Sequence, residues 1–145
     1  MSTTAEPMAE MHGSASRLWP RSRASVPRIR HQLATVLNVC GYGQLADTAA
    51  LLTTELVTNA VLHGRTAPGR EVGVRYVLSE GTVRVEVSDA CDDLPVWDSS
   101  AGAEAECGRG LVLLEALADA WGVEARAHSI GKTVWFELAN HCPVR

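Results

Sequence analysis

The 145-residue chain lacks most of the features that would assign it quickly to a class of protein. No apolar run approaches the roughly 20 residues that a membrane-spanning helix needs, and the N-terminus lacks the basic-then-apolar order of a secretion signal. The four cysteines are scattered without a Cys-x-x-Cys pair, so neither a zinc site nor a disulfide scaffold is indicated. The net charge of −4 gives no electrostatic reason to expect a nucleic acid as partner. We therefore expect a cytoplasmic protein with reduced thiols and with neither a membrane nor a nucleic acid as partner.

Sequence motifs for several common chemistries are also missing. There is no Gly-x-Ser-x-Gly elbow, and no histidine has ligand spacing with a second histidine or a cysteine. Gly131-Lys132-Thr133 resembles the end of a phosphate loop, but Arg126 stands where that motif needs a glycine, and a strand is expected to follow. Gly108-Arg109-Gly110 begins like a dinucleotide fingerprint, but Leu113 replaces its third glycine. Both motifs therefore fail as nucleotide signatures of those types.

The order of the remaining patterns predicts one α+β domain over residues 17–139. Residues 1–16 show no periodicity and are expected to form a disordered leader, and residues 140–145 a short tail. Apolar residues at helical spacing predict helices over 25–40, 44–63 and 108 to about 121. Alternating patterns predict an edge strand near 18–20 and two hairpins, formed by 72–78 with 83–88 and by 123–127 with 133–138. This order suits a two-layer sandwich with three helices on one face of a mixed, mainly antiparallel sheet.

The main functional indication is a polar series in the second predicted helix. Glu55, Asn59 and His63 recur every fourth position beside or within an apolar stripe, which turns them toward the interior. A buried carboxylate is costly unless it is paired, binds a metal or does chemistry. The alternative is structural: Glu55 stays at the solvent edge, Asn59 makes a side-chain hydrogen bond, and His63 caps the helix end before Gly64. The helix by itself leaves both interpretations open.

Two further positions have both a functional and a structural interpretation. Asp89 ends a strand of valines, where its carboxylate could accept a hydrogen bond from an amine such as N6 of adenine, although aspartate is also a common turn residue. Gly108 and Gly110 are expected to open the third helix, whose first N–H groups could bind a phosphate. An ordinary loop-to-helix joint is the other interpretation. The segment 90–107 is longer than a structural connection needs and is expected to act as a lid.

Taken in chain order, these motifs resemble the nucleotide-binding boxes of the GHKL ATPases. The matching motifs are Glu55-x-x-x-Asn59-Ala60-x-x-His63, Asp89, Gly108-x-Gly110-Leu111 and Gly131-x-Thr133. The resemblance runs from about Trp19 to Leu138 and implies a Bergerat-type ATP-binding fold. It is closest to the anti-sigma-factor serine/threonine kinase branch, including its short actinobacterial members. The stretches that carry this closer likeness are Thr54-Glu55-Leu56-Val57-Thr58-Asn59-Ala60 and Gly131-Lys132-Thr133-Val134-Trp135.

The resemblance implies a role for each matching residue. Glu55 would act as general base, and Asn59 would coordinate the Mg²⁺ ion that bridges the phosphates of ATP. Asp89 would hold the adenine amine, and Thr133 would support this contact through water. The other residues that the resemblance assigns to the nucleotide are His63, Gly108, Arg109, Gly110 and Leu111. Of these, the glycines would let the lid backbone close over phosphate, and Arg109 would contact the γ-phosphate.

One departure separates this chain from many GHKL proteins. They carry Asp-x-Gly-x-Gly after the central strand, whereas this chain has Asp89-Ala90-Cys91-Asp92-Asp93. The resemblance implies an ATP- and Mg²⁺-dependent serine/threonine protein kinase that regulates transcription by partner switching. Its partners would be a sigma factor and an anti-sigma-factor antagonist, which it phosphorylates on serine, and a homodimer is compatible with the same resemblance. The altered loop after Asp89 motivates an alternative, a non-catalytic ATP-binding module that sequesters a protein partner.

Overall fold

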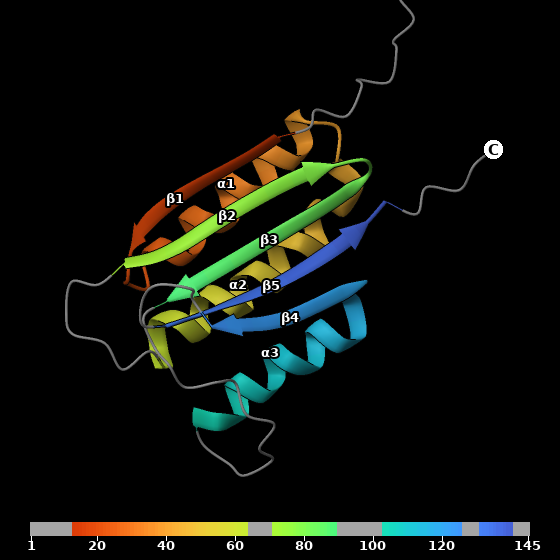
Figure 1. The fold of residues 1–145 in the computed structure, drawn as a ribbon. Coiled ribbons are helices and arrows are strands. Elements are labelled where there is room, and N and C mark those ends of the chain that lie inside the picture. Colours follow the sequence, from red (N-terminus) through yellow and green to blue (C-terminus); the bar gives the residue numbers. More distant parts are fainter. Residues whose placement is uncertain (1–12, 64–70, 90–102, 126–130, 141–145) are drawn as a thin grey trace, which may run out of the picture.

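The protein is a two-layer α+β sandwich in which three helices cover one face of a five-stranded sheet (Figure 1). The computed structural model describes residues 13–63, 71–89, 103–125 and 131–140. The elements are, in chain order, β1 (Gly13–Pro20), α1 (Ser25–Val39), the 3-10 helix η1 (Gly43–Leu45), α2 (Ala46–His63), β2 (Glu71–Ser79), β3 (Thr82–Asp89), α3 (Ala103–Leu117), β4 (Ala120–Ala125) and β5 (Lys132–Ala139). The predicted fold class is confirmed.

The sheet has the strand order β1-β2-β3-β5-β4, and each neighbouring pair among the described strands is antiparallel. The sheet is therefore antiparallel throughout its described part rather than mixed. Two hairpins, β2–β3 and β4–β5, are joined edge to edge through β3 and β5, while β1 returns to the far edge. Within the described residues, none of the helices has the length and apolar content that crossing a membrane requires.

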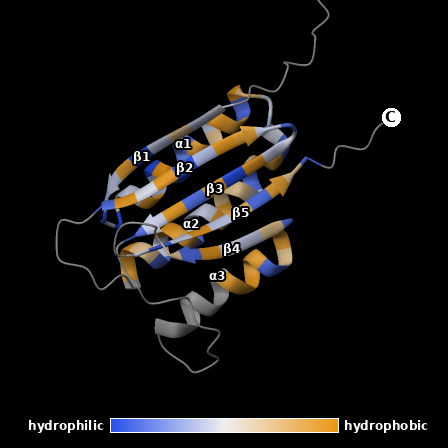
Figure 2. Ribbon diagram, in the orientation of Figure 1, coloured by the Kyte–Doolittle hydropathy of each residue, from blue (hydrophilic) through white to orange (hydrophobic). Residues whose placement is uncertain are grey.

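The core lies between the sheet and the helices. Along β3 the valines at 83, 85 and 87 are buried beneath the helices, and Arg84 and Glu86 lie on the other face, an alternation that the colours of Figure 2 follow. Phe136 of β5 is fully buried, and burial of such a side chain contributes about 1.5–3 kcal/mol. The helices complete this layer with Ile29, Leu33 and Leu37 from α1, Ala49, Leu52, Leu56, Val57 and Ala60 from α2, and Leu111 and Leu114 from α3.

The edge strand β1 begins earlier than the sequence predicts. It starts at Gly13, so residues 13–16 of the predicted leader are paired with β2. Trp19 is its one buried residue, so the strand has no alternation of apolar and polar positions that could reveal it. Backbone pairing to β2 defines this strand, and only the three-dimensional structure supplies that partner. Residues 1–12 and 141–145 lie outside the described part.

Helix α3 also begins earlier than predicted, at Ala103 instead of near Gly108. Alanine and glutamate alternate over 103–106, and both are strong helix formers. Since only the first four N–H groups of a helix lack intrahelical partners, the amides of Gly108 and Gly110 lie beyond the free ones. The expectation that these glycines open the helix is therefore wrong. The helix ends at Leu117, before the predicted end, because Trp121 and Gly122 belong to β4.

Candidate functional site

The elements that carry the predicted site residues meet at one end of the molecule. Asp89 is the last residue of β3 and Lys132 the first of β5, and the two are directly opposite in the strand register. Helix α2 packs against both β3 and α3, and its C-terminal turn lies at this same end (Figure 1). The pairing of β3 with β5 therefore brings Lys132 to Asp89, and the packing of α2 on β3 brings the Glu55–Asn59 helix to the same end of the molecule.

Glu55 and Asn59 lie where α2 packs against α3. A Cβ atom built on Gly110 would stand 3.0 Å from Nδ2 of Asn59 and 3.8 Å from Cβ of Glu55. The missing side chain at position 110 therefore lets the carboxamide of Asn59 lie directly against α3. Glu55 and Asn59 are each partly buried, at the shoulder of the apolar stripe as the helical spacing predicts. The structure thus brings three of the predicted residues together at one helix–helix contact.

The other residues that were predicted for this part of the site do not take part in the contact between Glu55, Asn59 and Gly110. Leu111 is only 4% exposed and belongs to the core, so it fixes α3 in place from within. Gly108 lies two residues nearer the start of α3 than Gly110, and the side chains of His63 and Arg109 lie outside the described part of the structure. Of the predicted lid over residues 90–107, residues 90–102 lie outside it as well, and residues 103–107 form the start of α3 instead of a loop.

Arg21, which the sequence did not single out, ties the turn after β1 to the last part of α2. Its Nε donates a hydrogen bond to the carbonyl oxygen of Ala60 at 3.2 Å, one residue after Asn59. A cation near the C-terminus of a helix interacts favourably with the helix dipole. This contact therefore helps to hold the polar end of α2 in position. Nothing in the local sequence pattern relates residues 39 positions apart.

Asp89 is one of few buried polar residues in the described part of the chain, and the residue as a whole is 7% exposed. The alternation of β3 places it with Val85 and Val87 on the helix-covered face. Nζ of Lys132 lies 3.4 Å from its Oδ2, and the two side chains are 12% and 9% exposed. This distance exceeds the roughly 2.7–2.9 Å of a tight charge-assisted hydrogen bond. The carboxylate at the end of β3 therefore has a close but loosely bonded cation beside it, and none of the sequence motifs includes this lysine as a site residue.

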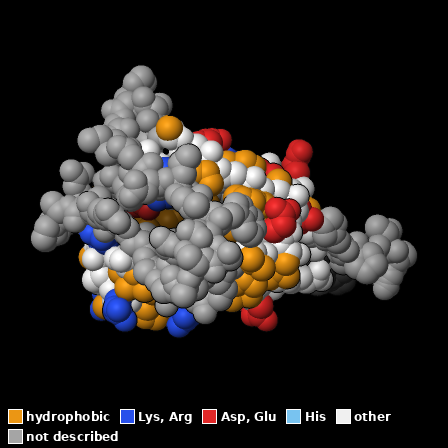
Figure 3. Space-filling model, turned by 90° about the horizontal axis from the view of Figure 1, so that it is seen from below, with side chains coloured by type: hydrophobic (Ala, Val, Ile, Leu, Met, Phe, Trp, Pro, Cys, Tyr) orange, Lys and Arg blue, Asp and Glu red, His pale blue; other side chains and the backbone are white. Residues whose placement is uncertain are grey.

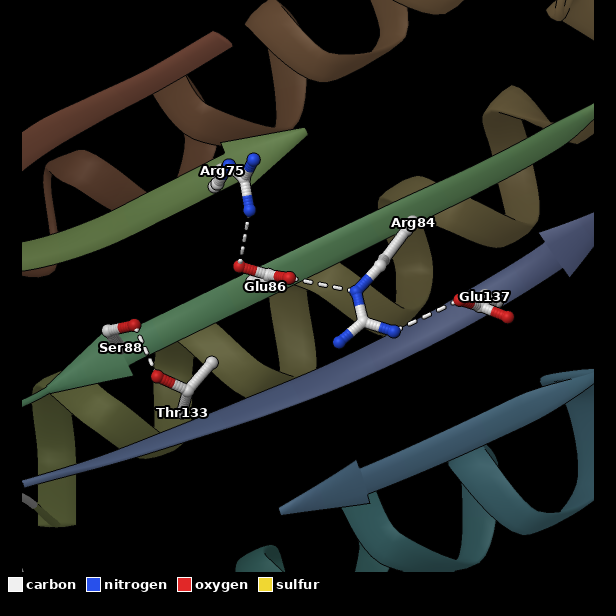
Figure 4. Close-up of polar contacts among 6 residues, drawn as sticks. All are labelled: Arg75, Arg84, Glu86, Ser88, Thr133 and Glu137. Atoms are coloured by element: carbon white, nitrogen blue, oxygen red, sulfur yellow. Dashed lines mark hydrogen bonds and ion pairs between the residues drawn. The ribbon is translucent and has the colours of Figure 1, made fainter. Parts of the chain in front are cut away.

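Thr133 lies on the opposite face of the sheet from Asp89. The register pairs it with Ser88, and the two hydroxyl oxygens are 2.7 Å apart (Figure 4). Successive residues of a strand point to opposite faces, so Thr133 and Lys132 cannot share one. The structure thus does not bring Thr133 to Asp89, as the water-mediated role implied. The inward alternation of Val134 and Phe136 already contained the signal, because it also places Lys132 inward.

The outer face of the sheet carries a network of charges around Arg84. Its Nε lies 2.8 Å from Glu86 and its Nη1 3.0 Å from Glu137, while Arg75 approaches Glu86 at 3.4 Å (Figure 4). The guanidinium stacks 4.0 Å from the ring centroid of Trp135. Burial opposes the charge of Arg84, but hydrogen bonds to both glutamates outweigh it and raise its pKa. This network faces away from the helices and is separate from the candidate site.

The charges visible from the side of α3 are unevenly distributed. In Figure 3 the Lys and Arg side chains lie mainly toward the left end, which is the end where β3 finishes in Figure 1, and the Asp and Glu side chains mainly toward the right. Within the described residues, no group of three His, Cys, Asp or Glu side chains gathers as a metal site. A divalent cation here would therefore depend on amide oxygen and on oxygens of the ligand.

The fold and the site together define a class: an antiparallel α+β sandwich that carries a carboxylate–carboxamide pair on one helix and a buried aspartate on the central strand. Comparison with known proteins agrees with this class. Residues 19–138 match the family model of the histidine kinase-like ATPase domain, and the chain belongs to this family. The predicted resemblance to the GHKL ATPases is thereby confirmed at the family level, and an ATP-binding domain is the corresponding coarse assignment.

The proteins that are similar to this chain include one of unknown function and one of solved structure. An uncharacterized protein of Streptomyces coelicolor is 41% identical over 75 residues, which cover 50% of this chain and 70% of that protein. The crystal structure of the RsbU and RsbW domains of Rv1364c from Mycobacterium tuberculosis matches with a TM-score of 0.63 at 21% identity. The match covers 88% of this chain and 32% of that one, so the chain spans about a third of the solved structure. At this identity, the likeness shows a common fold.

Proposed function

We propose that this protein is a cytoplasmic serine/threonine protein kinase of the anti-sigma-factor type, which transfers the γ-phosphoryl group of Mg-ATP to a serine of an antagonist protein. The observation that carries the proposal is the placement of Glu55 and Asn59, one helical turn apart, against Gly110 of α3. Membership of the histidine kinase-like ATPase family supports ATP as the nucleotide. The RsbW domain in the similar crystal structure agrees with the anti-sigma-factor resemblance of the helix motif.

The residues at the α2–α3 contact suit a magnesium–nucleotide complex. Mg²⁺ prefers oxygen ligands and keeps several waters, so the carboxamide oxygen of Asn59 together with phosphate oxygens is a sufficient set. The described residues offer no competing acidic cluster. Bound Mg²⁺ would offset negative charge on the phosphates. Asn59 would therefore hold the metal mainly through the nucleotide.

The chain's own residues would then perform positioning and proton transfer. Glu55 accepts the proton of the substrate serine while the serine oxygen attacks the γ-phosphorus of ATP. The bond from that phosphorus to the β–γ bridging oxygen breaks, and ADP leaves. Glu55 is partly buried and lies one helical turn before Asn59, so its carboxylate would lie beside phosphates that are held through Asn59. Asp89 accepts a hydrogen bond from the adenine amine at the end of β3.

The partners proposed by the same resemblance are a sigma factor and its anti-sigma antagonist. A phosphate on the antagonist adds about two negative charges and weakens a fitted protein interface, which would release the antagonist and free the kinase to bind the sigma factor. We propose in addition that the protein forms a homodimer. Sedimentation of the purified chain with and without nucleotide measures its oligomeric state.

Labelled ATP, Mg²⁺ and a candidate antagonist test the kinase proposal directly. We expect Glu55→Gln to retain ATP binding but to lower transfer by roughly 100-fold or more, because a general base contributes 10²–10⁴-fold. Asn59→Ala should weaken Mg²⁺-dependent binding itself. The matched control is Glu115→Gln, which removes an exposed carboxylate of α3 and should transfer at the native rate. Native rates in Glu55→Gln would contradict the assigned role.

The loosely paired cation beside Asp89 favours one second candidate, a non-catalytic module that binds ATP and sequesters a partner. In that case Lys132 and the missing glycines after Asp89 reflect a nucleotide site adapted for holding ATP instead of turning it over. The same assay separates the two functions. Saturable ATP binding with partner capture, but without transfer to any antagonist, would replace the kinase by the module.

A further inference from the structure

Asp89 and Lys132 present an acceptor and a donor side by side on the helix-covered face of the sheet. Both side chains are nearly buried, and Nζ of Lys132 lies 3.4 Å from Oδ2 of Asp89. An ammonium group has three hydrogens, and a carboxylate has about four lone-pair sites. The ammonium of Lys132 therefore has donors beyond the one that is directed at Asp89. These donors lie at the end of β3, where the proposed function places the base of ATP.

The edge of adenine presents the complementary pattern. Its N6 amine is a donor, and the adjacent ring nitrogen N1 is an acceptor. A lone carboxylate satisfies the amine but repels the lone pair on N1, so a second group has to supply the donor. Thr133 cannot supply it directly, because it is held on the other face by Ser88 at 2.7 Å. The first residue of β5 is the nearest cross-strand neighbour of Asp89, and it is a lysine.

We propose that Lys132 is a specificity-determining residue of the nucleotide site, which donates a hydrogen bond to N1 of adenine while Asp89 accepts one from the N6 amine. The inference rests on the proposed function in assuming that ATP binds with its base at Asp89. It differs from the role implied by the family resemblance, which gives the second contact to Thr133. In the absence of nucleotide, Lys132 also offsets the charge of the buried carboxylate.

Calorimetry with modified nucleotides measures the N1 contact in the native chain. The probes are Mg-ATP, its 1-deaza analogue, in which N1 is replaced by C–H, and its 7-deaza analogue as a control at another edge of the base. A hydrogen bond from a charged donor corresponds to roughly tenfold or more in Kd. We therefore expect the 1-deaza analogue to bind at least about tenfold more weakly than ATP, and the 7-deaza analogue to bind like ATP.

Variants at position 132 assign this penalty to the lysine. Lys132→Met removes the donor and should make ATP and 1-deaza-ATP nearly equal in Kd, whereas Lys132→Arg keeps a charged donor and should retain the penalty. Thr133→Val should retain it as well. Should Lys132→Met leave Asp89 without charge compensation and fail to fold, Asp89→Asn and the double variant Asp89→Asn/Lys132→Met replace it. The penalty should then persist in the single variant and disappear in the double one.

Several results would overturn the assignment. They are an unchanged penalty in a well-folded Lys132→Met protein, a penalty that disappears in Thr133→Val, and tighter binding of ATP by Lys132→Met, which would mean that the lysine competes with the base. Equal binding of ATP and 1-deaza-ATP by the native chain would refute this inference alone. Absence of ATP binding by the native chain would refute the proposed function and this inference together.

Discussion

One methyl group at Gly122 should disturb the sheet strongly. A Cβ atom built on this residue of β4 lies 2.9 Å from three ring atoms of Trp135, its partner on β5. Carbon atoms in favourable contact are about 3.5–4.0 Å apart, so the overlap amounts to roughly 0.6 Å or more. The indole ring is rigid and already stacks against the guanidinium of Arg84, whose Cζ lies 4.0 Å from the ring centroid. Gly122→Ala must therefore move the ring, the strand or both.

The expected destabilisation follows from three contributions. Overpacking of this kind costs about 1–3 kcal/mol. Displacing the indole from Arg84 adds about 0.5–1 kcal/mol. Alanine recovers roughly 0.5–1 kcal/mol because it loses less backbone entropy than glycine within a strand. We therefore expect Gly122→Ala to lower the free energy of unfolding by about 1–3 kcal/mol.

Urea denaturation of matched variants tests this value. Gly73→Ala is the control, because a Cβ atom there would meet Leu18 at 3.5 Å and Ser88 at 3.8 Å, which are ordinary contacts. It should change stability by less than about 0.5 kcal/mol or increase it slightly. In a Trp135→Ala background, Gly122→Ala should lose most of its cost. Equal effects of the two glycine substitutions, or an unchanged cost without the indole, would refute the packing explanation.

Three further changes test other parts of the structure. Burial raises the pKa of Tyr76 to about 12 against 10.0 for the free side chain, so the stability that its protonated form contributes is complete below pH 10 and lost between pH 10 and 12. Between pH 10 and 12, urea denaturation should show the free energy of unfolding of the native chain falling by about 2–3 kcal/mol more than that of Tyr76→Phe. At neutral pH the variant should be about 1 kcal/mol less stable than the native chain, because it lacks the hydrogen bond to Gln32. Gly110→Ala should change stability by less than about 1 kcal/mol, because helix propensity offsets the 3.0 Å contact, but calorimetry should show weaker Mg-ATP binding since Asn59 is displaced; native affinity would contradict this. Arg21→Met should lower the free energy of unfolding by about 1–2 kcal/mol through the lost bond to α2, and an unchanged urea midpoint would mean that the contact contributes nothing.

Periodicity accounts for what could be predicted from the sequence. Which side of a helix or strand a residue occupies is a local property of the backbone, repeating every 3.6 or every two residues. The apolar stripe of α2 therefore predicts Glu55 and Asn59 on its shoulder, and the alternating valines of β3 predict which face of that strand is buried; the structure shows that Asp89 lies on this face. The spacing and order of these residues were also sufficient for the family resemblance, which the family match confirms.

Contacts between elements were decided only by the tertiary structure. Residues 13–16 are in a strand because β2 pairs with them, and their own pattern contains no trace of it. The approach of Gly110 to Asn59 depends on how α3 crosses α2, and the ion pair of Asp89 with Lys132 depends on the register between β3 and β5. A one-residue shift in that register would bring Thr133 to Asp89, but it would also move every side chain of β5 to the opposite face of the sheet. The chain by itself determined which residues face inward, whereas packing and strand pairing determined which of them meet.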